Sequence, residues 1–440
     1  MMDVAALLET GSDETLNSLT NTRYEVQRAS RESLKKIQLE KLNRMLEVVL
    51  PVNHYYQKHF GCRHLQLNSI DDWAQFPVSR KSDWLSEKPD GVAIHHSFET
   101  STYRRYHRTS GTKGRPMVIL DTEEDWNWWT NTWQYVLDAC SIDETDRIFM
   151  AFSFGPFIGF WSAHDACLRR GCMVIPGGGM STIARIDLIE VAKPTVLFGT
   201  PSYALHLAQE ALARGKPLCD SSIKKVFVAG EPGGSIPSVR KSLEELYQSE
   251  VIDHAGATEI GPWGFGSCDG KAIHVIESEF IAEYLPLENI QDSQWNPDWR
   301  ELVLTSLGRT GAPVLRYRTG DIVHPVWDVS NSETSFVRLE GGILGRADDM
   351  FVIRGVNVFP SSIEAVVREF DSVREFRIML VKNGSLDELR LCIESTADLR
   401  KALEESLQVQ LGLRIPVELV PLGSLPPTEG KSRRVVRSSE

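Results

Sequence analysis

The apolar residues in the first ~60 positions return every three or four residues, which is the spacing of one face of a helix. The clearest stretch comprises Leu34, Ile37, Leu39, Leu42, Met45, Leu46 and Val49. This pattern predicts that the N-terminal region is helical.

From about residue 145 the pattern changes to short apolar runs separated by longer segments. The runs predict strands at residues 147–152, 172–175, 195–198 and 225–228. The segments between them predict helices at about residues 158–170, 202–214 and 237–248. Strands that alternate with helices through compact connections are typical of an α/β fold with a parallel sheet. Two later runs, at residues 301–305 and 314–318, predict strands of a more antiparallel region.

A glycine-rich stretch that contains Gly341, Gly342 and Gly345 lies just before Arg346 and marks a second change of pattern. The segments after it predict a strand, a helix, a strand, a helix and a strand, at residues 350–353, 361–369, 375–381, 398–408 and 416–419. We therefore expect a large N-terminal domain with mixed and parallel sheets at residues 1–345. A small α+β domain is expected at residues 346–440.

Composition excludes several classes of protein. A chain of 440 residues exceeds one ordinary domain, and 42% hydrophobic residues are enough for a large core. The formal net charge of -12 argues against general binding to nucleic acid or to anionic membranes. No apolar run approaches the ~20 residues of a membrane span, and the N-terminus lacks the cationic region of a signal peptide. Seven dispersed cysteines without a C-x-x-C pair favour reduced thiols and a cytoplasmic location.

The first candidate for chemistry is a polar loop that contains Thr109, Ser110, Gly111, Thr112, Lys113 and Gly114. Glycines let such a loop bend tightly, while backbone N–H groups, hydroxyls and the lysine can donate to an anion such as a polyphosphate. The loop does not contain the G-x-x-x-x-G-K-[ST] motif of the nucleotide triphosphatases. Taken alone, a polar glycine-rich stretch of this kind is more often a solvated turn than a phosphate site.

Further segments follow it in a fixed order. They read Ala-Gly-Glu-Pro at 229–232, Gly-Ala-Thr-Glu-Ile-Gly at 256–261, Arg-Tyr-Arg-Thr-Gly-Asp at 316–321, Gly-Arg-Ala-Asp-Asp-Met-Phe-Val-Ile-Arg-Gly-Val-Asn-Val-Phe-Pro at 345–360 and Leu-Pro-Pro-Thr-Glu-Gly-Lys-Ser-Arg at 425–433. Together with the polar loop, they resemble the core motifs of the acyl-adenylate-forming (ANL) superfamily. The chain is most similar to the phenylacetate–coenzyme A ligase-like branch, from about residue 70 to residue 437.

The resemblance implies an AMP-forming acyl-CoA synthetase that uses ATP, Mg²⁺ and coenzyme A. A carboxylic acid, aryl or aryl-acetic in this branch, would attack the α-phosphate of ATP and form an acyl adenylate and pyrophosphate. The thiol of coenzyme A would then displace AMP. Two alternatives stay open: delivery of the acyl group to a carrier-protein phosphopantetheine or another acceptor, and a non-catalytic homologue that binds ATP. A homodimer also stays open.

The resemblance also implies roles for individual residues in binding ATP. The 109–114 loop would hold the β- and γ-phosphates, Thr258 the α-phosphate, Glu259 the Mg²⁺ ion and Asp321 the ribose hydroxyls. Residues expected to border the nucleotide are Ala229, Gly230, Glu231, Pro232, Ala255, Gly256 and Arg346.

Other implied roles concern the acid and the small domain. Phe152 and Phe157, with Ala229 and Gly230, would line the acyl pocket, although each Phe could instead be buried core. Lys431 would bridge the substrate carboxylate and the α-phosphate. Asp348 would be the hinge about which the small domain rotates and brings the Arg354–Asn357 loop to the thiol.

The chain departs from the family pattern at two places. Ala255 stands where the family carries an aromatic residue, usually Tyr, that stacks on adenine, and Lys113 stands where many members carry Thr. Some relatives hold structural zinc, and Cys268 and His274 match part of that site. With His254 only three ligands are near, whereas a closed zinc site needs four. Ordinary buried Cys and His residues are therefore the preferred interpretation.

Overall fold

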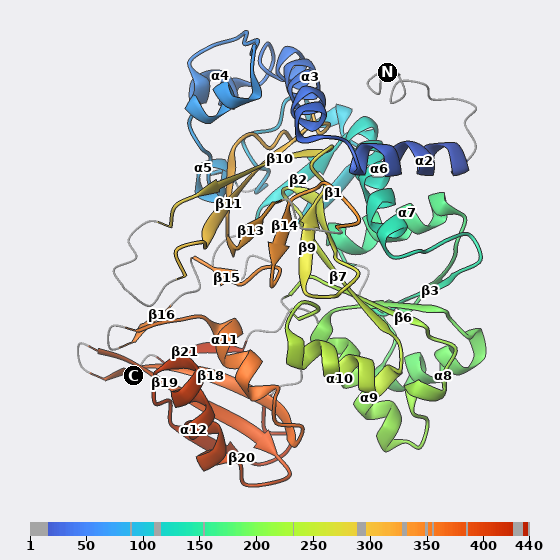
Figure 1. The fold of residues 1–440 in the computed structure, drawn as a ribbon, viewed down its shortest axis with the longest axis vertical. Coiled ribbons are helices and arrows are strands. Elements are labelled where there is room, and N and C mark those ends of the chain that lie inside the picture. The colour runs from blue at the N-terminus through green and yellow to red at the C-terminus, as the bar shows by residue number, and fades with distance from the viewer. Residues whose placement is uncertain are drawn as a thin grey trace.

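The computed structural model describes residues 16–88, 90–109, 116–152, 155–231, 233–287, 296–327, 332–347, 351–353, 356–383, 386–425 and 434–438. The helices within this part are α2 (Leu16–Gln27), α3 (Arg31–Val49), α4 (His54–Phe60), α5 (Lys81–Trp84), α6 (Glu123–Ala139), α7 (Ile158–Arg170), α8 (Thr182–Ala192), α9 (Pro201–Ala213), α10 (Pro237–Tyr247), α11 (Pro360–Val367) and α12 (Arg400–Leu411). Figure 1 shows a large lobe, which contains α2 to α10, and a smaller C-terminal lobe at the lower left of the view.

The N-terminal region is helical, as the apolar spacing predicts. Helix α3 begins after Ser30, whose Oγ accepts a hydrogen bond from Ser33 N at 3.1 Å, as an N-cap does. The predicted apolar face is buried at Leu34, Ile37, Leu42, Met45, Leu46 and Val49, while Leu39 is half-buried. Much of this face joins a hydrophobic cluster with Trp73 and Leu315 of the large lobe.

The main sheet of the large lobe has nine strands in the order β13-β14-β9-β8-β7-β6-β5-β3-β4. Its strands are β3 (Arg147–Met150), β4 (Met173–Pro176), β5 (Val196–Gly199), β6 (Lys225–Ala229), β7 (Glu250–Ala257), β8 (Gly261–Gly266), β9 (Ala272–Val275), β13 (Pro325–Val326) and β14 (Arg338–Glu340). Strands β4, β3, β5, β6 and β7 are parallel, and the pairs from β7 to β13 are antiparallel. The predicted parallel α/β region is thereby confirmed.

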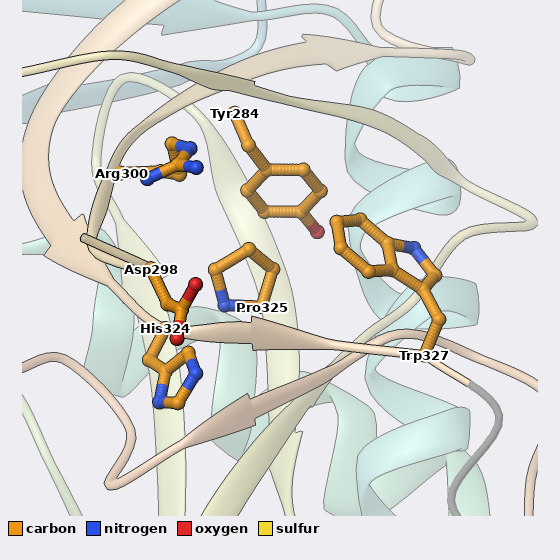
Figure 2. Close-up of a pocket in the computed structure, with 6 residues that line it drawn as sticks. All are labelled: Tyr284, Asp298, Arg300, His324, Pro325 and Trp327. Carbon is orange, nitrogen blue, oxygen red and sulfur yellow. The ribbon is translucent and has the colours of Figure 1, made fainter. Parts of the chain in front are cut away.

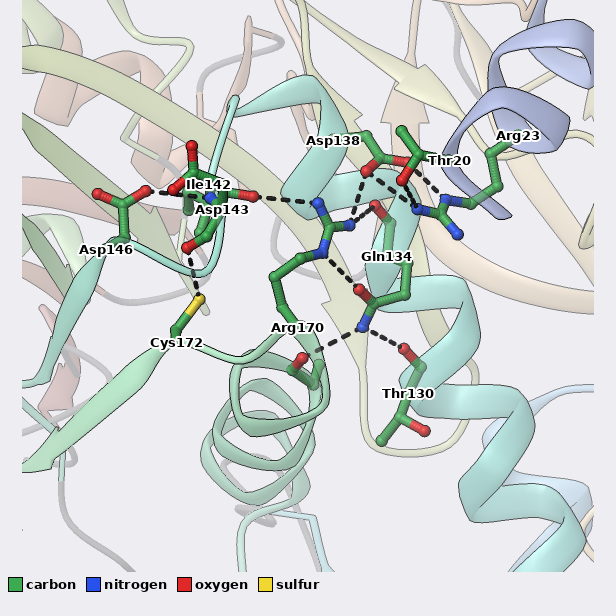
Figure 3. Close-up of polar contacts among 11 residues, drawn as sticks. Thr20, Arg23, Thr130, Gln134, Asp138, Ile142, Asp143, Asp146, Arg170 and Cys172 are labelled. Carbon is green, nitrogen blue, oxygen red and sulfur yellow. Dashed lines mark hydrogen bonds and ion pairs between the residues drawn. The ribbon is translucent and has the colours of Figure 1, made fainter. Parts of the chain in front are cut away.

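A buried polar network fastens helix α7 to helix α6 (Figure 3). The guanidinium of Arg170, near the end of α7, donates to the side chain and the carbonyl of Gln134, to the carbonyl of Ile142 and to Asp138. Asp138 also accepts from Arg23 of α2. Because each buried charge has a partner, the network orients three helices without leaving an unpaired ion in the core.

A second sheet of the large lobe contains β10 (Phe280–Leu285), β11 (Arg300–Ser306), β12 (Tyr317–Val323) and β15 (Gly345–Arg346), all antiparallel. The predicted strand at 301–305 is confirmed as β11. The predicted strand at 314–318 is wrong for its first three residues, because the backbone of Arg316 is left-handed, with φ +47°, and β12 begins only at Tyr317. Strands β1 (Arg105–Arg108) and β2 (Val118–Asp121) form a separate antiparallel pair.

The C-terminal lobe is built around a four-stranded sheet in the order β20-β19-β18-β21. The strands of this sheet are β18 (Val373–Asn383), β19 (Leu386–Ser395), β20 (Val417–Val420) and β21 (Val435–Ser438). Two short strands, β16 (Phe351–Ile353) and β17 (Val356–Val358), form a separate antiparallel pair. The five elements predicted here are present as β16, α11, β18, α12 and β20, whereas the sequence pattern missed β17, β19 and β21. A hydrophobic cluster that runs from Ile353 to Val417 gives this lobe a core of its own.

None of the helices in the described ranges combines the length and apolar character that a membrane crossing requires.

Candidate active site

The hairpin of β1 and β2 carries the polar loop at its tip. Thr109 and Met117 bond each other twice at the base of the loop: Thr109 N donates to the Met117 carbonyl at 3.0 Å, and Met117 N donates to Thr109 Oγ1 at 3.0 Å. Ser110, Gly111, Thr112, Lys113 and Gly114 lie outside the described residues. Thr109 is buried, so its hydroxyl closes the base of the loop.

Glu259 lies in the turn between β7 and β8, together with Thr258. Its Oε1 accepts from Lys81 Nζ of α5 at 3.2 Å and from the Tyr317 hydroxyl of β12 at 3.2 Å. Burial, followed by the charge of Glu259, raises the pKa of the Tyr317 phenol well above its ordinary value, so Tyr317 stays a donor. A nearly buried carboxylate with oxygen and ammonium partners is chemically suited to a hard cation such as Mg²⁺, which takes one or two carboxylates along with phosphate oxygens and water.

Arg309 supports this turn from behind. Its side chain is 0% exposed, and its Nη1 donates to the Glu259 carbonyl at 2.9 Å and to the Thr258 carbonyl at 3.3 Å. The same guanidinium pairs with Asp121 at the end of β2, with Nη2 to Oδ1 at 2.6 Å. Burial alone would raise the pKa of Asp121, but the charges and hydrogen bonds of Arg309 and His107 together outweigh it and hold this pKa below its usual value. The pair thus ties the hairpin to the Thr258–Glu259 turn.

Asp321 and Arg346 meet across the second sheet. They are register partners on β12 and β15, and Arg346 Nη1 donates to Asp321 Oδ1 at 3.0 Å. Arg346 Nη2 also donates to the Thr319 carbonyl at 3.1 Å. Because Asp321 and Tyr317 lie on the same strand, β12 carries both the ribose-binding candidate and the hydroxyl that holds Glu259.

The Ala-Gly-Glu-Pro segment begins at the carboxyl end of parallel strand β6, as its position after an apolar run predicts. Gly230 has φ +93°, a conformation that favours glycine, and so turns the chain out of the strand. Glu231 Oε1 then accepts from Ser202 N, in the first turn of α9, at 2.8 Å. The fourth residue, Pro232, lies outside the described residues.

Ala255 is buried in β7, in the main hydrophobic cluster, and Gly256 next to it is exposed. The two residues before them are buried and titratable. Burial lowers the pKa of His254 to about 4, against the hydrogen bond of its Nδ1 with the Gly264 carbonyl at 2.7 Å. Burial raises the pKa of Asp253 to about 6, although Ser235 Oγ donates to it.

The two candidate aromatic residues of the acyl pocket differ in exposure. Phe152 is 7% exposed and packs on Phe160, with ring centroids 4.0 Å apart. Its side chain is therefore buried in the core, which is the alternative to a place in the acyl pocket. Phe157 is 39% exposed at the residue before α7. Pro156, beside it, accepts a hydrogen bond from Arg108 N at 2.7 Å, which places the loop of Phe157 against the end of β1.

The remaining predicted residues have no described position: Lys431 and Asp348 lie outside the described residues. The partial zinc match is not assembled. Cys268 Sγ contacts Glu333, while His274 Nδ1 contacts the Phe336 carbonyl. Across the described ranges, no three His, Cys, Asp or Glu side chains lie together as a metal site. The interpretation of Cys268 as a buried residue is wrong, because its side chain is exposed.

A hollow of about 300 Å³ opens beside the second sheet, between β10, β11 and β13 (Figure 2). It is lined by Tyr284, Asp298, Arg300, His324, Pro325 and Trp327. None of the sequence-predicted site residues that have a described position lines it. The motif residues with described positions lie elsewhere: in the Glu259 turn, after the end of β6, and on β12 and β15.

Sequence reasoning missed three residues that this region depends on: Lys81, Arg309 and Asp121. Lys81 and Asp121 stand in no motif, and Arg309 lies seven residues before one. Tyr317 was within reach of the sequence, because it is the second residue of the quoted Arg-Tyr-Arg-Thr-Gly-Asp segment. No spacing rule links the other three to Glu259, which is up to 178 residues away.

The chain is similar to known enzymes in both sequence and structure. The family model of the AMP-binding enzyme C-terminal domain matches residues 355–438. The chain is 31% identical over 430 residues to the phenylacetate–coenzyme A ligase of Pseudomonas putida, a match that covers 92% of this chain and 94% of that protein.

Among solved structures, 2-hydroxyisobutyryl-CoA ligase in the postadenylation state, in complex with 2-HIB-AMP, superposes with a TM-score of 0.86 at 26% identity. The match covers 97% of this chain and 94% of that one. The same ligase with 2-HIB-AMP and CoA in the thioesterification state gives a TM-score of 0.70 at the same identity and coverage. Because both structures are of one protein, the lobe arrangement of this chain is closer to the postadenylation state.

Proposed function

Because the chain belongs to the phenylacetate–coenzyme A ligase family of adenylate-forming enzymes, we propose that its substrate is an aryl or aryl-acetic acid. The resemblance read from the motifs is confirmed over nearly the whole chain. The protein is an AMP-forming acyl-CoA ligase: it activates a carboxylic acid with ATP and transfers the acyl group to coenzyme A. The observation that carries this conclusion is the full-length match to a ligase of that reaction.

The reaction has two balanced steps. A carboxylate oxygen of the acid attacks the α-phosphorus of ATP, a new P–O bond forms, and the bond to pyrophosphate breaks. The sulfur of coenzyme A, which loses its proton, then attacks the acyl carbon, and AMP leaves with the C–O bonding pair. In both steps charge builds on phosphate oxygens, so catalysis depends on cations and donors placed around them.

We assign the first step to the Glu259 region. Mg²⁺ held by Glu259 would neutralise the phosphates, while Lys81 and Tyr317, the partners of this carboxylate in the structure, keep it oriented. Thr258 would contact the α-phosphate. Asp321, which accepts from Arg346, would accept hydrogen bonds from the ribose hydroxyls. The 109–114 loop would hold the departing pyrophosphate.

The acid and the small lobe take the remaining roles in this proposal. The exposed ring of Phe157 is the better candidate for edge contact with an aryl substrate, since Phe152 is buried against Phe160. Lys431 would bridge the carboxylate and the α-phosphate. The division into residues 1–345 and 346–440, with a hinge at Asp348, is part of the same proposal.

The direct test of the substrate is ATP–pyrophosphate exchange with a panel of aryl, aryl-acetic, fatty, hydroxy and amino acids. We expect exchange that requires both Mg²⁺ and one class of acid, and acyl-CoA formation when coenzyme A is added. Exchange with fatty or amino acids alone would overturn the assignment to aryl acids. Turnover of the adenylate by a carrier protein but not by coenzyme A would overturn the acceptor.

The residue roles have their own test. Lys431→Ala should lower exchange by about 100-fold, the size of a lost charge-stabilising donor. Glu259→Gln should raise the Mg²⁺ concentration needed for half-maximal exchange, with little change in binding of the acid. Lys401→Ala, an exposed lysine of the small lobe, is the matched control and should leave exchange unchanged. Wild-type exchange in Lys431→Ala would remove that residue from the mechanism.

We place the protein in the cytoplasm on the strength of its seven free cysteines, five of which are buried or half-buried. No membrane partner is proposed. The molecular mass in solution, measured by sedimentation equilibrium or light scattering, would decide whether the protein is a homodimer.

A further inference from the structure

Arg434 is the residue before β21 in the small lobe, and its side chain is largely buried. Three of its contacts are with other residues of the small lobe. Nη1 donates to Glu364 of α11, Nε donates to Glu375 Oε1 of β18 at 3.3 Å, and the guanidinium lies over the ring of Phe376, 4.4 Å from its centroid. Arg434 is therefore held firmly in the small lobe.

The same guanidinium also reaches the large lobe. Nη2 donates to Ser202 Oγ at 3.2 Å, across a sequence separation of 232 residues. Ser202 is in the first turn of α9, and its backbone N–H donates to Glu231 at 2.8 Å. One side chain thus links the small lobe to the turn that begins at the end of β6.

The charge of Glu231 favours this contact. Burial lowers the pKa of Arg434 to about 10, while the carboxylate of Glu231 acts in the opposite direction. The guanidinium therefore stays charged at neutral pH and faces an anionic turn of the large lobe. A charged donor in a buried position forms a stronger hydrogen bond than a neutral one.

Two further hydrogen bonds, both between neutral groups, also join the two lobes. Ser238 Oγ of α10 donates to the Ala365 carbonyl of α11 at 3.1 Å, and Ser361 Oγ donates to the Leu344 carbonyl at 3.0 Å. Figure 1 shows α11 on the side of the small lobe that faces the large lobe. The Arg434 contact is thus part of a lobe interface and not an isolated approach of two surfaces.

We propose that Arg434 is a docking residue that holds the small lobe on Ser202, and so on the Glu231 turn bonded to it, during adenylation, and that it is released for acyl transfer to coenzyme A. The inference rests on the proposed function and adds a residue to it. Glu231 belongs to the segment that the family resemblance places beside the nucleotide and the acyl group, so the contact couples that turn to the position of the small lobe. The lobe arrangement seen here is also the one closer to the postadenylation state.

The test separates the two half-reactions in the full-length enzyme. Adenylation is measured by ATP–pyrophosphate exchange, and transfer by the rate at which a supplied acyl adenylate acylates coenzyme A. Arg434→Ala should lower the maximal rate of exchange by about tenfold or more, as loss of a charged hydrogen bond implies, and leave transfer within about twofold. The Kd for ATP should not change, because Arg434 is placed to contact the lobe and not the nucleotide.

Two further variants guard against a simple folding defect. Ser202→Ala removes the partner on the large lobe and should lower exchange in the same direction by a few fold. Arg434→Lys, which keeps the charge but not the fork of donors, should fall between the wild type and Arg434→Ala. Arg400→Ala is the matched control, because Arg400 is an exposed arginine of the same lobe that pairs with Asp398. It should leave both half-reactions unchanged.

Amide hydrogen exchange gives a readout that does not require turnover. Peptides that cover the first turn of α9 and helix α11 should exchange faster in Arg434→Ala and Ser202→Ala than in the wild type, and at the wild-type rate in Arg400→Ala. Equal losses in both half-reactions, or unchanged protection of these peptides, would overturn the docking role. If the wild type activates no acid, the proposed function fails. The amide hydrogen exchange of these peptides still decides whether Arg434 docks the small lobe on the large lobe.

Discussion

His254 shows at the residue scale how burial sets a chemical property that the sequence leaves open. The centroid of its ring lies 4.4 Å from that of Trp133, and its Nδ1 forms a hydrogen bond with the Gly264 carbonyl. In water an imidazole titrates near pH 6.5, and burial moves the pKa of His254 to about 4. The folded protein therefore holds this ring neutral over a pH range in which the unfolded chain binds a proton.

This shift predicts a pH-dependent stability. The contribution of His254 is complete above pH 6.5 and is lost as the pH falls toward 4, by about 2–3 kcal/mol at 1.36 kcal/mol per pKa unit. Compared with the wild type, His254→Gln should therefore gain that much relative stability between pH 7.5 and pH 4.5. Chemical denaturation followed by tryptophan fluorescence measures it.

The neighbouring Asp253 provides the control of opposite sign. Its pKa is raised from 3.8 to about 6, so its contribution is present below pH 3.8 and is lost as the pH rises through 6. Asp253→Asn should accordingly gain stability, relative to the wild type, as the pH rises over this range. A difference between His254→Gln and the wild type that does not vary with pH would contradict the assignment.

At the residue scale the sequence identified the motif residues but not all the residues that hold them. Tyr317 of β12 donates to Glu259, and Asp321 on the same strand accepts from Arg346, a contact that the motifs did not predict. Arg309, which binds the carbonyls of the Thr258–Glu259 turn, could not be inferred, because a buried arginine is recognised by its surroundings and not by its spacing.

At the scale of elements, helix α6 illustrates how local chemistry starts a helix. Thr122 Oγ1 accepts from Asp125 N at 3.1 Å, and Asp125 Oδ2 accepts from Thr122 N at 3.0 Å, which is a reciprocal capping arrangement. Asp125 Oδ1 also accepts from Gly311 N at 3.0 Å, so the cap anchors the helix to the loop that follows β11.

This cap predicts a measurable loss of stability. Thr122→Ala and Thr122→Ser both remove the methyl group, and only the alanine also removes the capping hydroxyl. We expect the alanine variant to be less stable than the serine variant by about 1 kcal/mol. Urea denaturation followed by the fluorescence of Trp126 and Trp133, both in α6, checks it. Equal midpoints for the two variants would show that the hydroxyl does not stabilise the helix.

The sequence pattern predicted the helices correctly where the apolar spacing was regular. It failed at one strand that starts after a left-handed residue and at a strand that is defined by its pairing in the sheet. Helices α7, α9 and α10 lie within a residue or so of their expected positions. The strand expected from residue 314 begins late because of the left-handed Arg316. Strand β19 was missed, although its long pairing with β18 defines the small lobe.

At the scale of the whole molecule, the two lobes have separate hydrophobic clusters and unequal tryptophan content. The cluster of the small lobe includes Leu391, which is 0% exposed, while every tryptophan of the chain lies at or before residue 327. Tryptophan fluorescence therefore reports on the large lobe alone.

This distribution predicts how a core mutation in the small lobe behaves. Leu391→Ala should destabilise that lobe by about 2–5 kcal/mol and lower a transition seen by circular dichroism, without moving the fluorescence transition. Leu304→Ala, equally buried in the large lobe, should move the fluorescence transition. If Leu391→Ala shifted both signals together, the lobes would unfold as one unit.

By itself, the sequence determined the family, the α/β character of the large lobe and the identity of the motif residues, because these depend on local periodicity and on short ordered segments. The tertiary structure decided which side chains support them. Lys81 on Glu259, Arg309 behind the turn and Arg434 on Ser202 are contacts between residues far apart in the chain. Their pairing depends on how the sheets and lobes pack, and no local pattern encodes that packing.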